Sequence, residues 1–391
     1  MHYMEFGGAE RALLGLLNAI DTERVEVDLL LNQHTGAFLP LIPKKIHLLP
    51  EIPAYSAIER PMKAILKEGH WGVLLGRLLG KLRAKCYLWS HGKTHDGSYT
   101  QYAFDGVIGF LPSLGYLGHY DAAISFIDPP HIVQDKVDAD VKMEWVHTDF
   151  ETLDLNKPLT RRRWERNDYI IAISEAIGKQ FLKAYPGLDG KVRVIENIIS
   201  PQVVRQEAEA FYPAEYKQDG RLIICSVGRI STVKNFGCIP AVARRLKERG
   251  LNFDWYIIGP GDASAIMKSA SDLTVSDQVH CLGARSNPYP YLKHCDLYVQ
   301  PSLREGKSIT VREAQILGRP VVITHFATAE SHIQQGVDGV ICEMDNESIA
   351  DAVLALANDS SKRQAITDYL LAHDYGNEQE VNKIYALLRV D

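Results

Sequence analysis

The sequence predicts an α/β protein with two open, parallel β-sheets that are covered by helices on both faces. Short, mostly apolar runs alternate along the chain with helix-prone segments, and this pattern is typical of a parallel sheet buried on both faces. The alternation stops between Asn197 and Gly220, where prolines and polar residues indicate a connection. Because 391 residues suffice for about two domains, we expect one sheet on each side of that connection.

The first half contains an N-terminal helix and a series of strands. Only residues 1–6 precede a glycine pair and the apolar helix at 12–20, so we expect the chain to start inside its first strand. The later strands of this half are predicted at 25–31, 45–49, 121–125, 142–146, 169–173 and 192–195.

The second half repeats the alternation of strands and helices. Its strands are predicted at 221–227, 253–258, 278–282, 296–302, 320–324 and 339–342. Its first helix is predicted over 235–250, a second begins at about 289, and a third ends at 318. The last helices are predicted over 347–358, 361–371 and about 378–388.

Composition and charge exclude several classes of protein. With 46% hydrophobic and 24% charged residues the chain can bury a full core, and its net charge of -6 gives no overall attraction to nucleic acid. No apolar run reaches the roughly 18–20 residues that cross a bilayer, and no cleavable secretory signal is visible. The cysteines show no zinc-binding or redox spacing. We therefore expect a cytoplasmic protein with reduced thiols.

A basic amphipathic stretch lies between Arg60 and Lys93. Lysines and arginines recur through it against a single acidic residue, Glu68, and they are interleaved with tryptophan and leucine. A stretch of this kind can lie on an anionic membrane surface. A solvated helix that covers the core is an equally good interpretation of the same pattern.

Two glutamates, Glu305 and Glu313, stand eight positions apart across a predicted loop-to-helix junction. Eight residues of helix span about 12 Å, whereas the paired carboxylates of a glycosidase lie roughly 5–9.5 Å apart. The spacing therefore disfavours a glycosidase pair and suits two contacts on one long ligand. In the alternative interpretation, Glu305 is a charged loop residue and Glu313 is a solvated helix residue, and neither binds a ligand.

Further candidate ligand contacts lie directly after predicted strands. Arg229 and Lys234 follow the strand at 221–227, and a guanidinium fork with a point charge suits a diphosphate. His147 follows the strand at 142–146, at the edge where open α/β sheets bind ligands. Each of these residues, considered singly, is also explained as a surface cation or a structural histidine.

The pair Gly7-Gly8 opens the first helix. Glycine at a helix N-terminus lets backbone N–H groups approach an anion, although a tight turn without any ligand produces the same pattern. Two open sheets joined by a connection further imply a cleft, with the C-terminal strand edges of both sheets facing it.

The chain contains four motifs: Gly7-Gly-Ala-Glu-Arg11, Val227-Gly-Arg-Ile-Ser-Thr-Val-Lys-Asn235, Gly259-Pro-Gly-Asp262, and Pro301-Ser-Leu-Arg-Glu-Gly with Glu313. Together they resemble the retaining, metal-independent family 4 glycosyltransferases of the GT-B fold, and the likeness covers nearly the whole chain. Each motif alone is weakly specific, whereas the joint match is highly specific. The resemblance implies two Rossmann-like domains that face each other across a cleft, and it implies no bound cofactor or metal ion.

The resemblance also implies roles for individual residues. Arg229 and Lys234 match the pair that binds the donor's diphosphate. Glu305 matches the acid at the donor sugar, and Glu313 matches the acid at the nucleotide ribose. The other matches are Gly306, Lys307 and Ser308 near the sugar and phosphates, Gly7 and Gly8 beside the reaction centre, His147 at the donor sugar or acceptor, and Arg285 in the loop that lines the nucleobase.

The domain boundaries follow from the connection and the resemblance. We predict an N-terminal Rossmann-like, acceptor-side domain over 1–200, an interdomain connection over 201–220, a C-terminal Rossmann-like domain that binds the nucleotide sugar over 221–372, and a C-terminal helix over 373–391 that crosses back to the N-terminal domain. Two features depart from the family pattern. The first strand is truncated behind Gly7, and Lys307-Ser308 replaces a more frequent apolar residue, which leaves the choice of donor open.

The expected function is the retaining transfer of a hexose or N-acetylhexosamine from a nucleotide-diphosphate sugar, in the first place a UDP-sugar. The expected acceptor is a lipid-linked glycan or a polysaccharide in cell-surface glycan synthesis, reached at an anionic membrane surface on the inner face of the cell membrane. Arg229 and Lys234 would stabilise the negative charge that develops on the departing diphosphate without a metal ion. Two alternatives remain: a nucleotide-sugar epimerase of the same fold, and a catalytically silent partner subunit of a glycosyltransferase.

Overall fold

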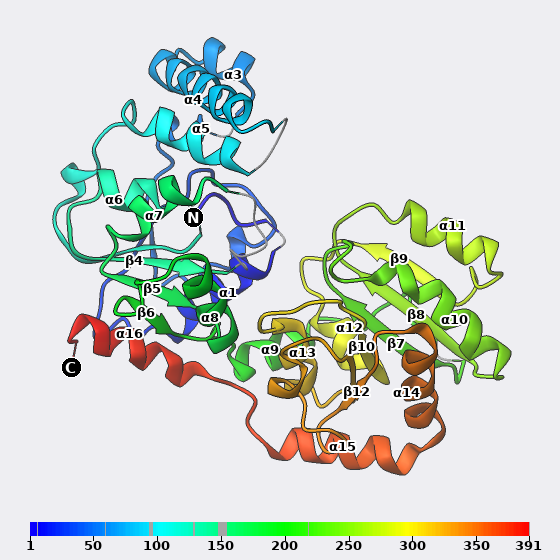
Figure 1. Ribbon diagram of the computed structural model, residues 1–391. Helices are drawn as coiled ribbons and strands as arrows, with labels where there is room; N and C mark the ends of the chain where they lie inside the picture. The colour runs from blue at the N-terminus through cyan, green and yellow to red at the C-terminus, as the bar shows by residue number, and fades with distance from the viewer. Residues whose placement is uncertain are drawn as a thin grey trace. The chain divides into compact units, whose positions relative to one another are not determined.

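The computed structural model describes residues 1–5, 7–58, 60–93, 97–127, 130–147, 155–217 and 219–390. The chain divides into two compact units, and Figure 1 labels most of their helices and strands. Unit 1 consists of Met1–Glu5, Leu17–Glu196 and Gln379–Asp391, and unit 2 consists of Phe6–Leu16 and Asn197–Glu378. Helix α1 (Gly8–Ala19) therefore contributes its first turns to unit 2 and its last turn to unit 1.

The boundary between the two units differs from the predicted interdomain connection over 201–220. Residues 201–220 contain α9 (Pro201–Ala208), which buries Val204 and Ala208 in the core of unit 2, so this stretch is part of that unit. The chain passes from unit 1 to unit 2 after Glu196. The C-terminal segment, for which we predict a return to the N-terminal domain, groups with unit 1 from Gln379 onward.

Unit 1 holds a 4-stranded parallel sheet with the order β3-β4-β5-β6 and a separate parallel pair, β1-β2. The central strands are buried on both faces, as predicted: Trp145 and Val146 in β4, and Ile170 and Ile171 in β5, are at most 3% exposed. The strands are β1 (Asp28–Leu29), β2 (His47–Leu48), β3 (Tyr120–Ser125), β4 (Ala139–Val146), β5 (Tyr169–Ala172) and β6 (Val192–Val194).

The strand predicted at 25–31 is shorter than expected, because only Asp28–Leu29 pairs as β1. The residues after β1 bond instead to the N-terminal segment. The N–H groups of Asn32 and Gln33 donate to the carbonyls of Met1 and His2 at 3.0 and 2.9 Å. The first residues thus lie alongside the chain that follows β1, without forming a regular strand.

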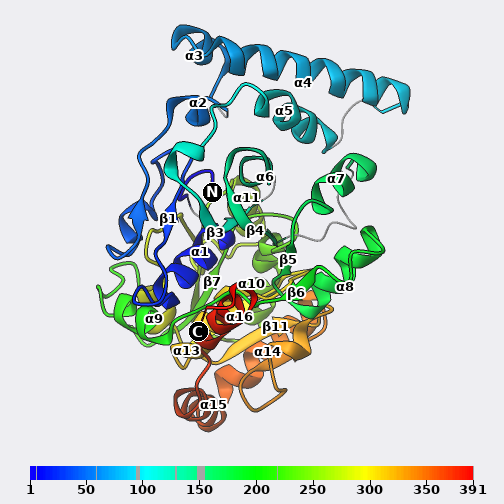
Figure 2. The ribbon, with the colours of Figure 1, turned by 90° about the vertical axis from the view of Figure 1, so that its left-hand side faces the viewer.

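The helices of unit 1 include a layer outside the sheet. In two perpendicular views α5 lies between α4 and the strands (Figures 1 and 2). The last helix, α16, also belongs to this unit, where the Tyr385 hydroxyl accepts a hydrogen bond from the N–H of Asp21 at 2.8 Å. The helices are α2 (Pro53–Ser56), α3 (Met62–Lys67), α4 (Trp71–Ser90), α5 (Ser98–Ile108), α6 (His131–Lys136), α7 (Lys157–Trp164), α8 (Glu175–Ala184) and α16 (Val381–Leu388).

Unit 2 contains a 6-stranded parallel sheet with the order β12-β11-β10-β7-β8-β9. In chain order within the unit this is the Rossmann arrangement, with the first strand, β7, beside the fourth, β10. The order reverses between these two strands, and open α/β sheets bind ligands at the C-terminal edge of that switch point. The strands are β7 (Leu222–Val227), β8 (Phe253–Ile258), β9 (Val279–Gly283), β10 (Leu297–Gln300), β11 (Val321–Thr324) and β12 (Val340–Cys342).

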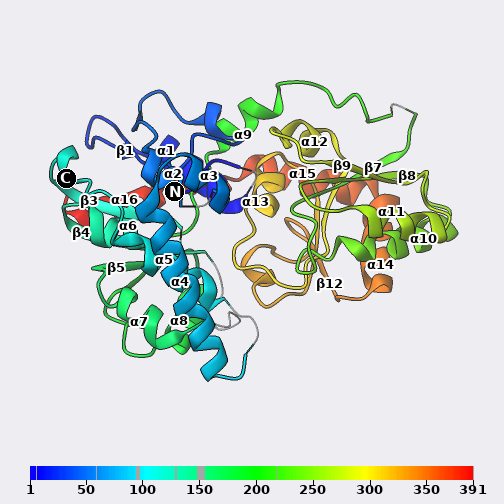
Figure 3. The same cartoon turned by 90° about the horizontal axis from the view of Figure 1, so that it is seen from above.

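The core of unit 2 lies between its sheet and the helices on both faces, which Figure 3 shows from above. Every residue of β8, β10 and β11 is buried, as expected for strands covered on two sides. The helices are α10 (Ile239–Glu248), α11 (Ser264–Asp272), α12 (Tyr289–His294), α13 (Ile309–Ile316), α14 (Asn346–Asn358) and α15 (Ser360–Ala372), in addition to α9. Among the described residues of both units, no helix is long and apolar enough to cross a bilayer.

Candidate functional site

The candidate site of unit 2 lies at the switch point of its sheet. The loop after β7 carries Arg229 and Lys234, and the loop after β10 carries Glu305. Because β7 and β10 are neighbouring parallel strands, their C-terminal ends lie at the same edge. The two loops also bond to each other, since the N–H of Leu303 donates to the carbonyl of Val233 at 2.8 Å. The topology therefore brings the predicted phosphate and sugar contacts together.

Lys234 and Glu305 form an ion pair at this edge. The Lys234 Nζ lies 2.7 Å from Glu305 Oε1, and the two side chains are 21% and 10% exposed. The same carboxylate oxygen also accepts hydrogen bonds from Gln300 Nε2 at 2.9 Å and Ser302 Oγ at 2.6 Å. Three donors on one oxygen fix the carboxylate in one orientation. Gln300 and Ser302 escaped the sequence analysis because they appeared only as the end of a strand.

Arg229 lies on the exposed side of the same loop and, within the described part of the chain, forms no hydrogen bond or ion pair. The loop itself is held by the Gly259–Asp262 motif, because the N–H of Ile230 donates to the carbonyl of Pro260 at 2.8 Å. The guanidinium is therefore available to an anion at a position that the backbone defines.

The loop from Gly306 to Ser308 is anchored by a buried histidine that the sequence analysis missed. The N–H of Ser308 donates to His332 Nε2 at 2.7 Å, while His332 Nδ1 lies 2.8 Å from the carbonyl of Thr328. Burial lowers the pKa of His332 to about 4, so the ring is neutral at pH 7 with its proton on Nδ1. Gly306 is half-buried, and Lys307 Nζ lies 3.4 Å from the Ser331 carbonyl.

Glu313 lies in α13 and is almost completely enclosed. Its side chain is 1% exposed. Arg11 Nη1 donates to both carboxylate oxygens, at 3.0 Å to Oε1 and 2.8 Å to Oε2, and the Tyr289 hydroxyl donates to Oε1 at 2.8 Å. The Arg11 guanidinium also lies 5.3 Å from the centre of the Tyr289 ring. The acid predicted to meet a ribose thus already has partners, and Arg11 belongs with it in unit 2.

A buried tyrosine lies within electrostatic range of both acids. Burial raises the pKa of Tyr298 well above its ordinary value, and the negative charges of Glu305 and Glu313 add to that increase. Its hydroxyl donates to Gln300, the residue that in turn donates to Glu305. Tyr298 is therefore hydrogen-bonded to the group of side chains around Glu305, whereas Glu313 acts on it only through its charge.

The two N-terminal glycines differ in what surrounds them. Gly8 is the first residue of α1, and a side chain there would meet no atom within 4 Å. A Cβ on Gly7 would lie 2.0 Å from Glu10 Oε2, so Gly7 is closely packed. The predicted helix start is therefore present, and Arg11, one turn further along, joins this end of α1 to Glu313.

Arg285 and His147 have hydrogen-bond partners other than Glu305 and Glu313. Arg285 Nη2 donates to Glu215 Oε1 at 3.0 Å and its Nε donates to the Tyr291 hydroxyl at 3.1 Å, and these contacts raise its pKa. His147 belongs to unit 1, directly after β4, where its Nε2 lies 2.9 Å from the carbonyl of Phe126. Burial lowers the pKa of His147 to about 4, so it is a neutral hydrogen-bonding group at pH 7.

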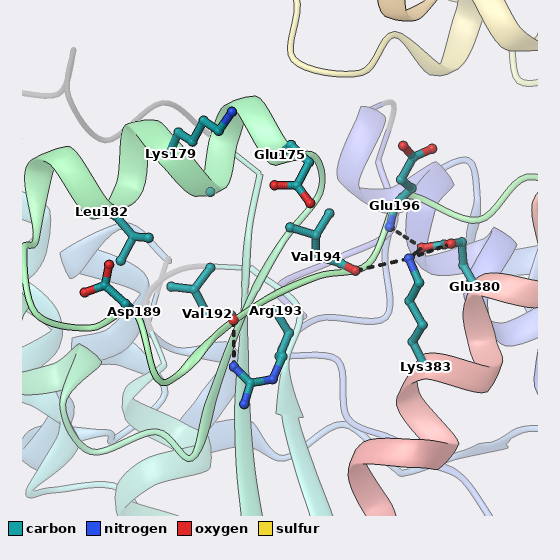
Figure 4. Close-up of a pocket in the computed structure, with 11 residues that line it drawn as sticks. Glu175, Lys179, Leu182, Asp189, Val192, Arg193, Val194, Glu196, Glu380 and Lys383 are labelled. Carbon is teal, nitrogen blue, oxygen red and sulfur yellow. Dashed lines mark hydrogen bonds and ion pairs between the residues drawn. The ribbon is translucent and has the colours of Figure 1, made fainter.

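An open pocket in unit 1 contains none of the predicted site residues. It has a volume of about 540 Å³ and lies between α8, β6 and α16 (Figure 4). Acidic and basic side chains line it together, and two of them, Lys383 and Glu380, pair with each other at 2.8 Å. The N–H of Glu196 also donates to Glu380 at 2.9 Å. These contacts attach the C-terminal segment to unit 1.

One family model matches within unit 2. Residues 209–370 match the family described as Glycosyl transferases group 1. The chain is 30% identical over 173 residues to the putative glycosyltransferase EpsF of Bacillus subtilis, covering 44% of each protein. It is 24% identical over 191 residues to the N,N'-diacetylbacillosaminyl-diphospho-undecaprenol alpha-1,3-N-acetylgalactosaminyltransferase of Campylobacter jejuni, covering 47% of this chain and 50% of the relative.

The name of a third relative includes a sugar donor, UDP-Gal. The chain is 26% identical over 184 residues to the UDP-Gal:alpha-D-GlcNAc-diphosphoundecaprenol alpha-1,3-galactosyltransferase of Escherichia coli, covering 43% of this chain and 46% of the relative. The chain thus spans about half the length of these curated relatives.

Solved structures resemble the whole chain. The structure of WaaG, a glycosyltransferase involved in lipopolysaccharide biosynthesis, matches with a TM-score of 0.65 at 15% identity over 99% of this chain and 98% of WaaG. The structure of HepE from Anabaena in complex with UDP-glucose matches with a TM-score of 0.65 at 16% identity, over 99% and 97%. Together with the parallel sheets of both units, this likeness confirms the predicted GT-B fold.

Proposed function

Because residues 209–370 belong to the Glycosyl transferases group 1 family, we propose that the protein is a glycosyltransferase that uses a nucleotide-diphosphate sugar. The observation that carries this proposal is the contact between Lys234 and Glu305 at the switch point of unit 2, with Arg229 exposed on the same loop. A cation for phosphate and an acid for sugar hydroxyls stand side by side where a doubly wound sheet binds ligands.

The proposed donor is a UDP-sugar. A relative from Escherichia coli carries UDP-Gal in its name, and HepE was solved with UDP-glucose. The sugar itself, a hexose or an N-acetylhexosamine, would contact Glu305 and the loop from Gly306 to Ser308. We propose that Lys307 contributes to donor choice, because its flexible, charged side chain lies on that loop.

The proposed chemistry uses electrostatic stabilisation by the chain's own groups. As the bond between the anomeric carbon and the diphosphate breaks, negative charge develops on the leaving phosphate. Arg229, Lys234 and the amides at the start of α13 would stabilise that charge without a metal ion. Retention of configuration would follow if the acceptor attacks from the face that the diphosphate leaves, with a phosphate oxygen taking the acceptor's proton.

The proposed acceptor is a lipid-linked glycan or a polysaccharide. Two relatives act, by their names, on diphospho-undecaprenol-linked sugars. An acceptor of this kind is anchored in a membrane, so we place the protein in the cytoplasm as a peripheral protein on the inner face of the cell membrane. His147 in unit 1, a neutral hydrogen-bonding group, would contact the donor sugar or the acceptor.

The test is a panel of nucleotide sugars offered to the purified full chain. A UDP-sugar should raise the melting temperature and, with an undecaprenyl-diphosphate-linked acceptor, release UDP. Lys234→Met should lower the transfer rate roughly 10²–10³-fold, the range found when a group that stabilises developing charge is removed. Glu305→Gln should also lower the rate, because it removes the charged acceptor for sugar hydroxyls and the ion-pair partner of Lys234. Lys268→Gln, an exposed lysine on α11, should leave the rate unchanged.

Three outcomes would contradict the proposal or its mechanism. If no nucleotide sugar in the panel raises the melting temperature or is turned over, the protein is not a transferase of this class. If the donor is converted to an epimer without any acceptor, the epimerase interpretation replaces it. Activity that is lost in EDTA and restored by a divalent cation would refute the metal-independent mechanism.

A further inference from the structure

Helix α4 buries two glycines and an alanine together with a valine and one leucine, and it leaves both tryptophans and several leucines exposed. Its buried face consists of Val73, Gly76, Gly80, Ala84 and Leu88. The opposite face carries Trp71, Leu75, Leu78, Leu82 and Trp89, which are 65%, 49%, 48%, 60% and 87% exposed. Both sets recur every three or four residues, so each occupies one side of the helix. An ordinary surface helix has the reverse arrangement, with its leucines against the core.

Close packing against α5 decides which face is exposed. A Cβ on Gly80 would lie 2.4 Å from the carbonyl oxygen of Tyr102, and a Cβ on Gly106 of α5 would lie 2.3 Å from the carbonyl oxygen of Gly76. The two backbones therefore approach too closely for larger side chains. Turning the leucines of α4 toward α5 would separate the helices, so the leucines stay outward. Figures 2 and 3 show α4 as the outer helix of this pair.

Exposed cations lie on α4 itself and on α3, which contacts α4 through Met62 and Lys81. Lys63 and Lys67 of α3, and Arg83 and Lys85 of α4, are all exposed. Helix α4 contains no acidic residue. The single acidic residue between Arg60 and Lys93 is Glu68, which Arg60 Nη1 contacts at 2.9 Å. The surface thus combines an apolar stripe with cations.

We infer that this surface, which we call the docking face, binds an anionic lipid bilayer. It consists of the exposed residues Trp71, Leu75, Leu78, Leu82 and Trp89 with Lys63, Lys67, Arg83 and Lys85. The helix lies parallel to the membrane plane: its leucines enter the acyl boundary, its terminal tryptophans lie at headgroup level, and its cations meet anionic headgroups.

Charge favours a bilayer over a second copy of the chain as the occupant. Two docking faces placed together would bring their cations near each other with no acid from α4 to pair with them. An anionic bilayer supplies the missing negative charge and an apolar layer at once. The inference names the membrane partner of the proposed function, on which it rests for its biological setting, whereas the measurements below require no catalysis.

The first experiment measures binding of the full chain to vesicles by sedimentation. The protein should sediment with vesicles of phosphatidylcholine mixed with phosphatidylglycerol, and much less with phosphatidylcholine alone. Leu75→Ser with Leu78→Ser and Leu82→Ser should weaken binding about tenfold or more. Replacing Lys63, Lys67, Arg83 and Lys85 by glutamine should also weaken binding about tenfold or more, and raised salt should mimic that change.

The second experiment uses tryptophan fluorescence to locate the contact. Of the five tryptophans, Trp145, Trp164 and Trp255 are at most 3% exposed, so lipids brominated in their acyl chains should quench only Trp71 and Trp89. Quenching should fall strongly in Trp71→Phe with Trp89→Phe. It should persist in wild type with a short-chain acceptor or UDP present, because it does not depend on turnover.

Matched controls lie on the helices of unit 2. Met267→Ser with Leu371→Ser replaces apolar residues that are 38% and 54% exposed, and Lys268→Gln with Lys362→Gln removes exposed cations. Both should leave vesicle binding unchanged. Circular dichroism and melting temperature establish that every variant folds.

Three results would overturn the inference. The first is binding that survives the leucine and cation variants. The second is equal quenching after both exposed tryptophans are replaced. The third is a dimer, seen by sedimentation velocity, that the leucine variant abolishes while vesicle binding stays the same. If the protein binds vesicles as expected but transfers no sugar, the proposed function is refuted, whereas the inference that the docking face binds a bilayer still holds.

Discussion

Arg11 and Glu313 are 302 positions apart in the sequence, and their contact is the feature of the site that a linear sequence hides best. The motif around Gly7 and the acid in α13 were both recognised, but as separate parts. Spacing predicts which residues lie near one strand end, whereas an ion pair between distant segments depends on how α1 meets α13. The same limit applies to His332, which lies 24 positions from the loop that it anchors.

The ion pair predicts a large coupling between its two members. Arg11→Met leaves a carboxylate that is 1% exposed with only the Tyr289 hydroxyl, and this should lower the free energy of unfolding of unit 2 by about 3–5 kcal/mol. Glu313→Gln alone should also be destabilising. The double variant should recover roughly 2 kcal/mol or more relative to the sum of the single losses. Urea unfolding, followed by hydrogen exchange of β7 and β10, measures each value.

Arg24 provides the control for this comparison of single and double variants. It also contacts a tyrosine ring, that of Tyr385, but it belongs to unit 1. Arg24→Met should leave exchange in β7 and β10 unchanged. Single losses that add within about 0.5 kcal/mol would mean that the two side chains do not support each other.

His332 gives unit 2 a stability that depends on pH. Its pKa falls from an ordinary value of 6.5 to about 4 because the ring is buried. Between these values the unfolded chain binds a proton that the folded chain does not, so stability is full above pH 6.5 and declines as the pH falls toward 4. The loss should reach roughly 3 kcal/mol.

The check is the slope of unfolding free energy against pH for wild type and His332→Gln. Gln can still accept the Ser308 N–H but cannot take up a proton, so the variant should lose less stability between pH 6.5 and 4. His373→Gln, at an exposed histidine, should retain the wild-type slope. An NMR titration that places the His332 pKa near 6.5 would refute the argument.

At the scale of elements, the sequence predicts where strands lie better than it predicts which side of a helix is buried. Apolar runs in the sequence predict each of the strands β3 to β12, because a strand that is buried on both faces consists mostly of apolar residues. The runs at 25–31 and 45–49 formed only Asp28–Leu29 and His47–Leu48, since the chain after β1 bonds to the N-terminal residues instead. Periodicity alone could not predict that shortening.

Helix α4 shows why the outward face was harder to predict. Its pattern was amphipathic, and leucines are normally assigned to the core. The structure buries Gly76 and Gly80 instead, because their missing side chains let α5 approach. Glycines spaced four apart were therefore the informative signal. Of the two interpretations of 60–93, a helix that covers the core describes the buried side of α4. The anionic membrane surface stays a proposal for the exposed side.

At the scale of the whole molecule, the chain returns to its first unit after completing its second. Helix α15 lies in unit 2, whereas α16 lies in unit 1 with Val381, Ile384 and Tyr385 buried. A residue near the C-terminus should therefore stabilise strands that lie some two hundred residues earlier, and have little effect on the sheet that directly precedes it in sequence.

Ile384→Ala tests this division. Removing a buried isoleucine side chain, 4% exposed, should lower the free energy of unfolding of unit 1 by about 2–5 kcal/mol. Hydrogen exchange should then accelerate in β4 and β5 and stay unchanged in β7 and β10, because the lost contacts belong to unit 1. Leu371→Ala on α15, 54% exposed, should change the stability of unit 2 by only about 0.5 kcal/mol. Acceleration of β7 and β10 in the Ile384 variant, with β4 and β5 unaffected, would show that α16 supports unit 2 instead. The two units could then not be treated as separate in stability.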